Sequence, residues 1–276
     1  MRRNFGPRTV VKGVVIAALL IFTLFPAYWM ISSSFDARAS SGGQSLLPQE
    51  FTWDNYIFVF NEGRFGVFLR NSFVVAFFTV LISGILALLA SVAVARFRFK
   101  FRTSVLILVL TVQMVPLEAL VIPLFVQVRD LHMLNSLLGL VVVYLAFSLP
   151  FAIWMLRGFV AAVPVELEEA AYLDGASWGR MFRSVMLPLV APGLVATSIF
   201  SFIVAWNEFI FAMTLLGGAS DTYTVAIGLK QFFGLHSNDW GPVMAASTII
   251  TIPVMIFFVI VQRRLSGGLV SGAVKG

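Results

Sequence analysis

The sequence predicts an all-α membrane protein with six transmembrane helices and a cytoplasmic helix between spans four and five. Composition is the first indication, because 59% of the 276 residues are hydrophobic and 12% are charged, against about 25% charged in soluble domains. Six apolar stretches are each long enough to cross a hydrocarbon core as a helix of about 20 residues. Lipid leaves only helices or closed barrels, and no stretch alternates as a strand does. The predicted spans are 11–33, 71–95, 104–128, 136–160, 191–216 and 240–262.

The first span follows four basic residues, as the apolar region of a signal peptide does. Its length and the five further spans favour an uncleaved first span. We therefore predict that residues 1–70 form an N-terminal span with the first external loop, and that 71–276 form a five-span core. Within the external loop, 34–69, Trp53 and Tyr56 either rest at the membrane interface or face a partner protein.

The positively charged residues predict the orientation. With the N-terminus inside, the inner segments hold 14 of the 19 Lys and Arg residues and the outer loops hold five. This asymmetry places both termini, and the loop between the fourth and fifth spans, in the cytoplasm. The basic run RFRFKFR at 96–102 then acts as a stop-transfer anchor among lipid headgroups. Neither this run nor the pI near 10.1 requires a nucleic-acid partner.

The predicted cytoplasmic loop, residues 164–190, contains helix signals of its own. Pro164 suits a first helical position, and the glutamates after it complement the positive end of the helix dipole. Gly175 is placed to end this helix in a left-handed cap. Ser177 can cap a second helix, which Leu187–Pro188 then breaks before the fifth span. Helices this short are unstable alone, so the loop is either a docking element or a plain connector on the surface.

The same loop has a spaced pattern of Glu-Ala-Ala, three residues, Gly, nine residues, an aliphatic residue, one residue and Leu-Pro. With this pattern the chain resembles permease subunits of bacterial ATP-binding-cassette importers, and Val185 stands where that family commonly has isoleucine. The segments PAYWMISSSF, LPFAIWMLRGF, AWNEFIFA and GLVSGAVKG extend the resemblance over nearly the whole chain, to the maltose-transporter-type carbohydrate-uptake branch. The matching motif positions are Glu169, Ala170, Ala171, Gly175, Leu187 and Pro188.

This resemblance implies a permease subunit in a bacterial cell membrane that imports a sugar or sugar derivative, with glycerol-phosphate-type and amino-sugar ligands also open. The first loop helix would be the coupling helix, seated in a cleft of an ATPase subunit, where it converts ATP-driven closure into movement of the spans. The implied partners are a second homologous permease, an ATPase dimer that holds ATP and Mg, an external solute-binding protein and membrane lipid.

The resemblance also assigns roles to residues. Within the C-terminal cytoplasmic tail, 263–276, the residues Gly272 to Gly276 would lie along the ATPase dimer. The implied ATPase-coupling positions are Glu168, Glu169, Ala170, Ala171, Asp174, Gly175, Leu187 and Pro188. The implied contacts with the solute-binding protein are Phe232, Phe233, Gly234, Leu235, His236, Ser237, Asn238 and Asp239.

The lysines bear on whether this chain could hydrolyse ATP itself. A phosphate-binding loop needs Gly, four residues and Gly-Lys-Ser/Thr, but the four lysines are followed by Gly, Phe, Gln and Gly. We therefore expect no cofactor in this chain, and ATP hydrolysis in a partner. The alternative is an ATP-independent secondary transporter or channel, which would explain the spans but not the spaced pattern. A membrane enzyme is disfavoured, because there is no cysteine and the two histidines show no metal-ligand spacing.

Polar residues within the apolar runs are the candidates for a translocation pathway, because charges in a membrane are costly and usually functional. Glu118 in the third span and Glu208 in the fifth are the two carboxylates there. In straight helices they would lie about 3 Å and about 5–6 Å outward of the span midpoints, at nearly one depth. Interhelical hydrogen bonding is the structural alternative. The pathway candidates are Gln113, Glu118, Ser201, Asn207 and Glu208.

Overall fold

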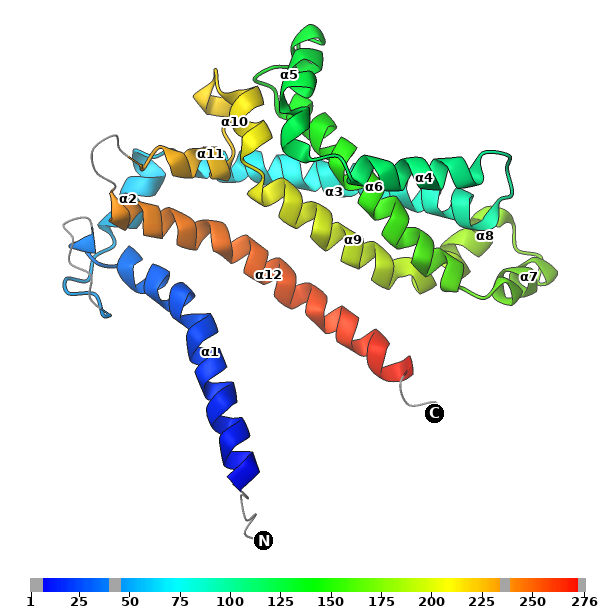
Figure 1. Ribbon diagram of the computed structural model, residues 1–276, viewed down its shortest axis with the longest axis horizontal. Coiled ribbons are helices and arrows are strands. Elements are labelled where there is room, and N and C mark those ends of the chain that lie inside the picture. The colour runs from blue at the N-terminus through cyan, green and yellow to red at the C-terminus, as the bar shows by residue number, and fades with distance from the viewer. Residues whose placement is uncertain (1–6, 40–45, 234–238, 273–276) are drawn as a thin grey trace. The chain divides into compact units, whose positions relative to one another are not determined.

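The computed structural model describes residues 7–39, 46–233 and 239–272, and these form helices joined by loops (Figure 1). A single residue pair, Asp36 and Phe51, forms an antiparallel bridge within the described residues. The predicted all-α class is confirmed. The helices are α1 (Pro7–Ser34), α2 (Asp54–Asn61), α3 (Phe65–Arg96), α4 (Arg102–Gln113), η2 (Leu117–Leu120), α5 (Val121–Asp130), α6 (Leu137–Ala162), α7 (Val165–Leu173), α8 (Trp178–Met181), the π-helical turn η3 (Phe182–Met186), α9 (Leu187–Asn207), α10 (Ile210–Leu216), η4 (Ser220–Thr222), α11 (Val225–Lys230) and α12 (Trp240–Gly272).

Five helices of the described chain are long and apolar enough to cross a membrane. The third predicted span is sharply bent, because Arg102–Gln113 and Leu117–Asp130 meet at an angle of 94°. Pro116 lies in this break, where its missing amide hydrogen removes a helical hydrogen bond. The count is therefore five spans, or six if the bent pair is one span. The five are Val11–Ser34, Phe65–Arg96, Leu137–Ala162, Trp178–Asn207 and Trp240–Ile260.

The fifth span also departs from the sequence prediction at both ends. Leu187–Pro188 does not break the helix, since one continuous helix runs from Trp178 to Asn207. The π turn η3 directly precedes α9, so the regular helical bonding pattern is already interrupted where Pro188 lacks its amide hydrogen. At the other end, the helix stops at Asn207 instead of continuing to 216, and α10 begins at Ile210.

The chain divides into two compact units. One comprises residues 1–65 and 228–252, and the other comprises 66–227 and 253–276. In the second unit, α6 and α9 pack side by side (Figure 1). Gly193 of α9 permits this packing, because a Cβ there would lie 2.4 Å from Cγ of Phe159. The buried cluster at one end of this pair joins α3, α6, α8 and α9 through Leu88, Val92, Leu156, Met181, Met186 and Val190.

In the first unit, the segment after α1 packs around an aromatic cluster. The ring centroids of Trp53 and Tyr56 lie 4.9 and 5.0 Å from that of Phe35, so both contact this ring, and Trp53 is still 57% exposed. Asp36 accepts hydrogen bonds from the backbone N–H groups of residues 38, 49 and 50, at 3.0, 3.2 and 3.4 Å. Burial raises the pKa of Asp36, but these N–H groups and the Arg38 charge outweigh it and hold the pKa below the ordinary 3.8.

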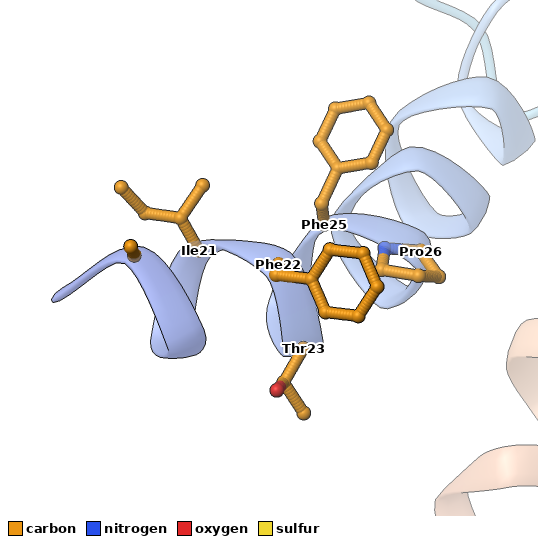
Figure 2. Close-up of a pocket in the computed structure, with 6 residues that line it drawn as sticks. Ile21, Phe22, Thr23, Phe25 and Pro26 are labelled. Atoms are coloured by element: carbon orange, nitrogen blue, oxygen red, sulfur yellow. The ribbon is translucent and has the colours of Figure 1, made fainter. Parts of the chain in front are cut away.

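The helix α1 presents an apolar surface. Figure 2 shows Ile21, Phe22 and Phe25 projecting from α1, and the residues that line the open surface at this point all belong to this helix. Phe22 is 80% exposed, and no residue in the most apolar window of the span is buried within the described chain. Such a surface is typical of a helix that meets lipid or another apolar surface.

Candidate functional site

The loop 164–190 forms the short helix α7 and the first turns of the continuous helix Trp178–Asn207. The first predicted loop helix is confirmed, whereas the predicted second one is the beginning of the fifth span. Pro164 occupies the N-cap position of α7, one residue earlier than expected. Glu166 and Glu168 lie in the first turn, where negative charge complements the helix dipole. Ser177 precedes α8 in extended conformation, but its side chain makes no capping hydrogen bond. Ser177 therefore occupies the predicted N-cap position of α8 without the side-chain hydrogen bond of a cap.

Gly175 ends α7 in the left-handed region, with φ of +80°, which confirms the predicted cap. The amide of Ala176 donates to the carbonyl of Ala171 at 2.9 Å, and the amide of Gly175 donates to that of Tyr172 at 3.0 Å. This pair of bonds is a Schellman motif, which satisfies the last carbonyls of the helix. A Cβ at Gly175 would meet nothing within 4 Å. Backbone conformation alone, and not space, therefore favours glycine here.

The two faces of α7 have different surroundings. Glu166, Glu169, Ala170 and Leu173 follow the i, i+3, i+4, i+7 spacing of one helix face, and all are exposed, Leu173 at 89%. On the opposite side, Ala171 packs against the buried cluster of α3, α6 and α9, as Ala176 and Leu187 do beyond the helix. Asp174, at the end of α7, and Pro188 are exposed. The loop therefore offers an outer surface while its inner side is fixed to the spans.

Glu168 lies on the inner side and is only 8% exposed. Its Oε1 accepts a hydrogen bond from Nε of Arg96 at 2.6 Å, and Nη2 of Arg96 also donates to the carbonyl of Val163 at 2.7 Å. Sequence reasoning assigned Arg96 only to a basic anchor and did not connect it with Glu168. The two residues are 72 positions apart, so only their arrangement in space reveals the pair.

Among the described residues, the carboxylate of Glu208 has three hydrogen-bond donors. The hydroxyl of Tyr144 donates to Oε2 at 2.6 Å, and the backbone amides of Phe211 and Ala212 donate at 2.8 and 3.0 Å. Glu208 itself ends α9, and those amides are the first unpaired donors of α10. The side chain therefore caps α10 across a break in an apolar run, a role that sequence reasoning missed together with that of Tyr144.

The other pathway candidates are not gathered at one point. Glu118 and Asn207 are exposed, whereas Ser201 is 1% exposed and lies 3.5 Å from the hydroxyl of Ser83. The segments that carry Glu118 and Glu208 are both broken. The prediction that the two carboxylates lie at nearly one depth assumed straight helices, so it does not follow from this structure. Gln113 lines a cavity of about 260 Å³ between α4, α6 and α9, together with the stacked rings of Phe151 and Phe200.

The predicted contact segment 232–239 is described only at its ends. Phe232 is 6% exposed and packs against Phe58 and Phe65, with ring centroids at 6.3 and 6.1 Å. Phe233 is 43% exposed, and Asp239 is the first described residue after the gap. The described residues contain no group of His, Cys, Asp and Glu that could hold a metal ion. Outside the described residues lie the candidates Gly234, Leu235, His236, Ser237 and Asn238, and the last four residues of the tail, 273–276.

Comparison with known proteins gives a consistent result. A family model described as binding-protein-dependent transport system inner membrane component matches residues 83–270. The diacetylchitobiose uptake system permease protein DasC of Streptomyces coelicolor is 40% identical over the full length of both chains. The trehalose transport system permease protein SugB of Mycobacterium tuberculosis is 35% identical over 98% of this chain and all of that protein. In fold, a chain of the bacterial ABC transporter that imports the acidic polysaccharide alginate is similar, with a TM-score of 0.78 at 23% identity over 95% of this chain and 98% of that one.

Proposed function

Because the chain belongs to the family of binding-protein-dependent transport system inner membrane components, we propose that this multi-pass permease subunit imports a sugar or sugar derivative of about disaccharide size. The supporting observation is the 40% identity, over the whole of both chains, with a permease for diacetylchitobiose. A trehalose permease at 35% identity supports the same class. Diacetylchitobiose and trehalose are both disaccharides rich in hydroxyl groups.

The importer would contain a second permease subunit, an ATPase dimer that holds ATP and Mg, and an external solute-binding protein. The four lysines of this chain all lack the neighbours of a phosphate-binding loop, which supports a separate ATPase. The exposed face of α7 is the surface that we assign to the ATPase, with Glu169, Ala170 and Leu173 at its centre. Glu168 faces the spans, so its part in coupling would be indirect.

The orientation follows the basic residues. With 14 of 19 Lys and Arg on one side, both termini and the loop 164–190 would lie in the cytoplasm. The segment 232–239 would then face outward, toward the solute-binding protein. Glu118, Asn207 and Gln113 remain the candidates for the sugar pathway, because their polar groups are exposed within apolar segments.

Reconstitution tests this function. The permease pair and ATPase would be placed in liposomes with the cognate solute-binding protein, whose ligand is first identified by a thermal-shift panel of disaccharides, amino sugars and glycerol phosphates. We expect uptake of the stabilising sugar only with ATP and the binding protein. Uptake by this chain without ATP would contradict the proposal and favour a secondary transporter.

A charge reversal tests the docking face within the same preparation. Glu169→Lys should leave the chain inserted but weaken its association with the ATPase by about tenfold, which corresponds to ~1.4 kcal/mol. The matched control is Asp130→Lys, the same reversal at an exposed carboxylate at the end of α5. Equal ATPase association in both variants would contradict docking at this face.

A further inference from the structure

The feature that carries a further inference is the side chain of Arg96. It is the last residue of α3, and its two hydrogen bonds reach Glu168 in α7 and the carbonyl of Val163, the residue that ends α6. One guanidinium group therefore joins the ends of two spans to the loop helix. The side chains of Arg96 and Glu168 are only 14% and 10% exposed, so the pair is largely shielded from water.

The neighbouring basic residues show that this arrangement is specific. Arg98 and Lys100 follow Arg96 within four residues, yet both are exposed and neither has a carboxylate partner among the described residues. A positively charged anchor for the membrane would not require a shielded guanidinium with two separate hydrogen-bond acceptors. Arg96 is directed inward because it has two acceptors that a planar guanidinium can reach at once.

Two faces of α7 then have separate tasks. The outer face is free to meet a partner, whereas the inner face is held by the Arg96–Glu168 pair and by Ala171 against the buried cluster. A helix of nine residues that is attached only through its ends would shift or unwind when pushed. The hydrogen bonds of Arg96 connect α7 directly to the end of α3 and to the residue that ends α6.

We propose that Arg96 is a positioning residue for energy coupling: it fixes the loop helix α7 to the spans α3 and α6, so that force on the outer face of α7 moves the spans. This inference rests on the proposed function, in which an ATPase acts on that face. Arg96 itself would touch neither the sugar nor ATP. Its contribution would be visible in the amount of sugar moved for each ATP hydrolysed.

The test uses the complete reconstituted importer and measures uptake and ATP hydrolysis together. Arg96→Gln and Glu168→Gln should retain assembly and hydrolysis, while the uptake per ATP falls by about tenfold or more, as expected when a working geometry is loosened. Arg96→Lys keeps the charge but can reach one acceptor at a time, so its uptake per ATP should lie between those of the wild type and Arg96→Gln. The control Arg98→Gln should behave as the wild type.

A second measurement does not depend on transport. The chain has no cysteine, so spin labels at Leu173→Cys and Phe97→Cys, both exposed, report the distance between α7 and the end of α3 in nanodiscs. Arg96→Gln should broaden that distance distribution, and the exchanged pair Arg96→Glu with Glu168→Arg should narrow it again in part.

An unchanged distribution with an unchanged ratio of uptake to ATP would overturn the inference. Uptake and hydrolysis that fall in equal proportion would also overturn it, because the pair would then be only structural. If instead the wild-type importer shows no ATP-dependent uptake while the label distances respond to Arg96→Gln, the proposed function fails and the positioning of α7 by Arg96 stands.

Discussion

Two helix interruptions in the second unit, at Gly175 and at Glu208, are stabilised by different kinds of contact. The break at Gly175 lies in a polar loop and is stabilised by residues next to it, through a left-handed glycine and two local backbone bonds. The break at Glu208 lies in an apolar run, where the side chain of Glu208 accepts from the nearby amides of Phe211 and Ala212 and also from Tyr144, 64 residues earlier in the chain. Water can pair the free amides of a polar loop, whereas an apolar surrounding cannot. A break of the second kind therefore needs partners that the folded chain supplies.

The largest expected effect comes from Glu208→Leu. This change leaves the Tyr144 hydroxyl and the amides of Phe211 and Ala212 without their acceptor, at about 1–3 kcal/mol for each unpaired buried donor. We expect a marked loss of assembled protein and a lower Tm in detergent, measured by fluorescence-detected size exclusion after heating. Glu118→Leu is the control, since that carboxylate is exposed and should affect uptake more than assembly. Equal Tm values would contradict the capping role of Glu208.

A smaller effect is expected at the polar break. Gly175→Val places a β-branched residue at φ of +80°, which costs about 1–2 kcal/mol in the left-handed region. Gly175→Asn should be milder, because asparagine tolerates this conformation. Limited proteolysis of the loop 164–190 should be faster in the valine variant and nearly normal in the asparagine variant. If both variants are cut at the same rate, conformational strain is not the determinant.

The variant Tyr144→Phe removes the hydrogen bond between Tyr144 and Glu208 and leaves the bonds between Glu208 and the nearby backbone amides. Glu208 keeps its two backbone donors, and one hydrogen bond to a charged group is lost, about 1.5 kcal/mol at the low end of its usual range. The Tm should therefore fall less than in Glu208→Leu. In a double-mutant cycle with Glu208→Gln, we expect the two effects to be non-additive, since the residues share one bond. Strict additivity would show that Tyr144 acts independently of the break.

The smallest effect concerns Asp36, a carboxylate that holds backbone amides outside the spans. Its pKa is below 3.8 in the folded chain, so its contribution to stability is complete above pH 3.8 and is lost as the pH falls through the lowered value. The fluorescence of Trp53, isolated by subtraction of a Trp53→Phe variant, should be constant at pH 5–7 and change only at strongly acidic pH. Asp36→Asn should remove that acid transition.

Local signals in the sequence predicted much of the fold and part of the site. The apolar runs indicated the spans, and Gly175 indicated its own left-handed cap because that preference resides in one residue. Pro116 and Pro188 differ in their effect, and the break that the sequence predicted at Leu187–Pro188 is absent. The structure shows a 94° bend after the first and a continuous helix through the second. The difference arises from the π turn before Pro188, which the sequence does not mark.

The sequence by itself determined that this chain is an all-α membrane protein with an exposed helical loop between two spans, because hydrophobicity and helix capping are local properties. The tertiary structure decided which acidic residues are available to partners. Glu168 and Glu169 are neighbours in the sequence, yet one is buried against Arg96 and the other is exposed. Helical periodicity separates their directions, but only the packing of α7 against α3 and α6 determines which direction is the inner one.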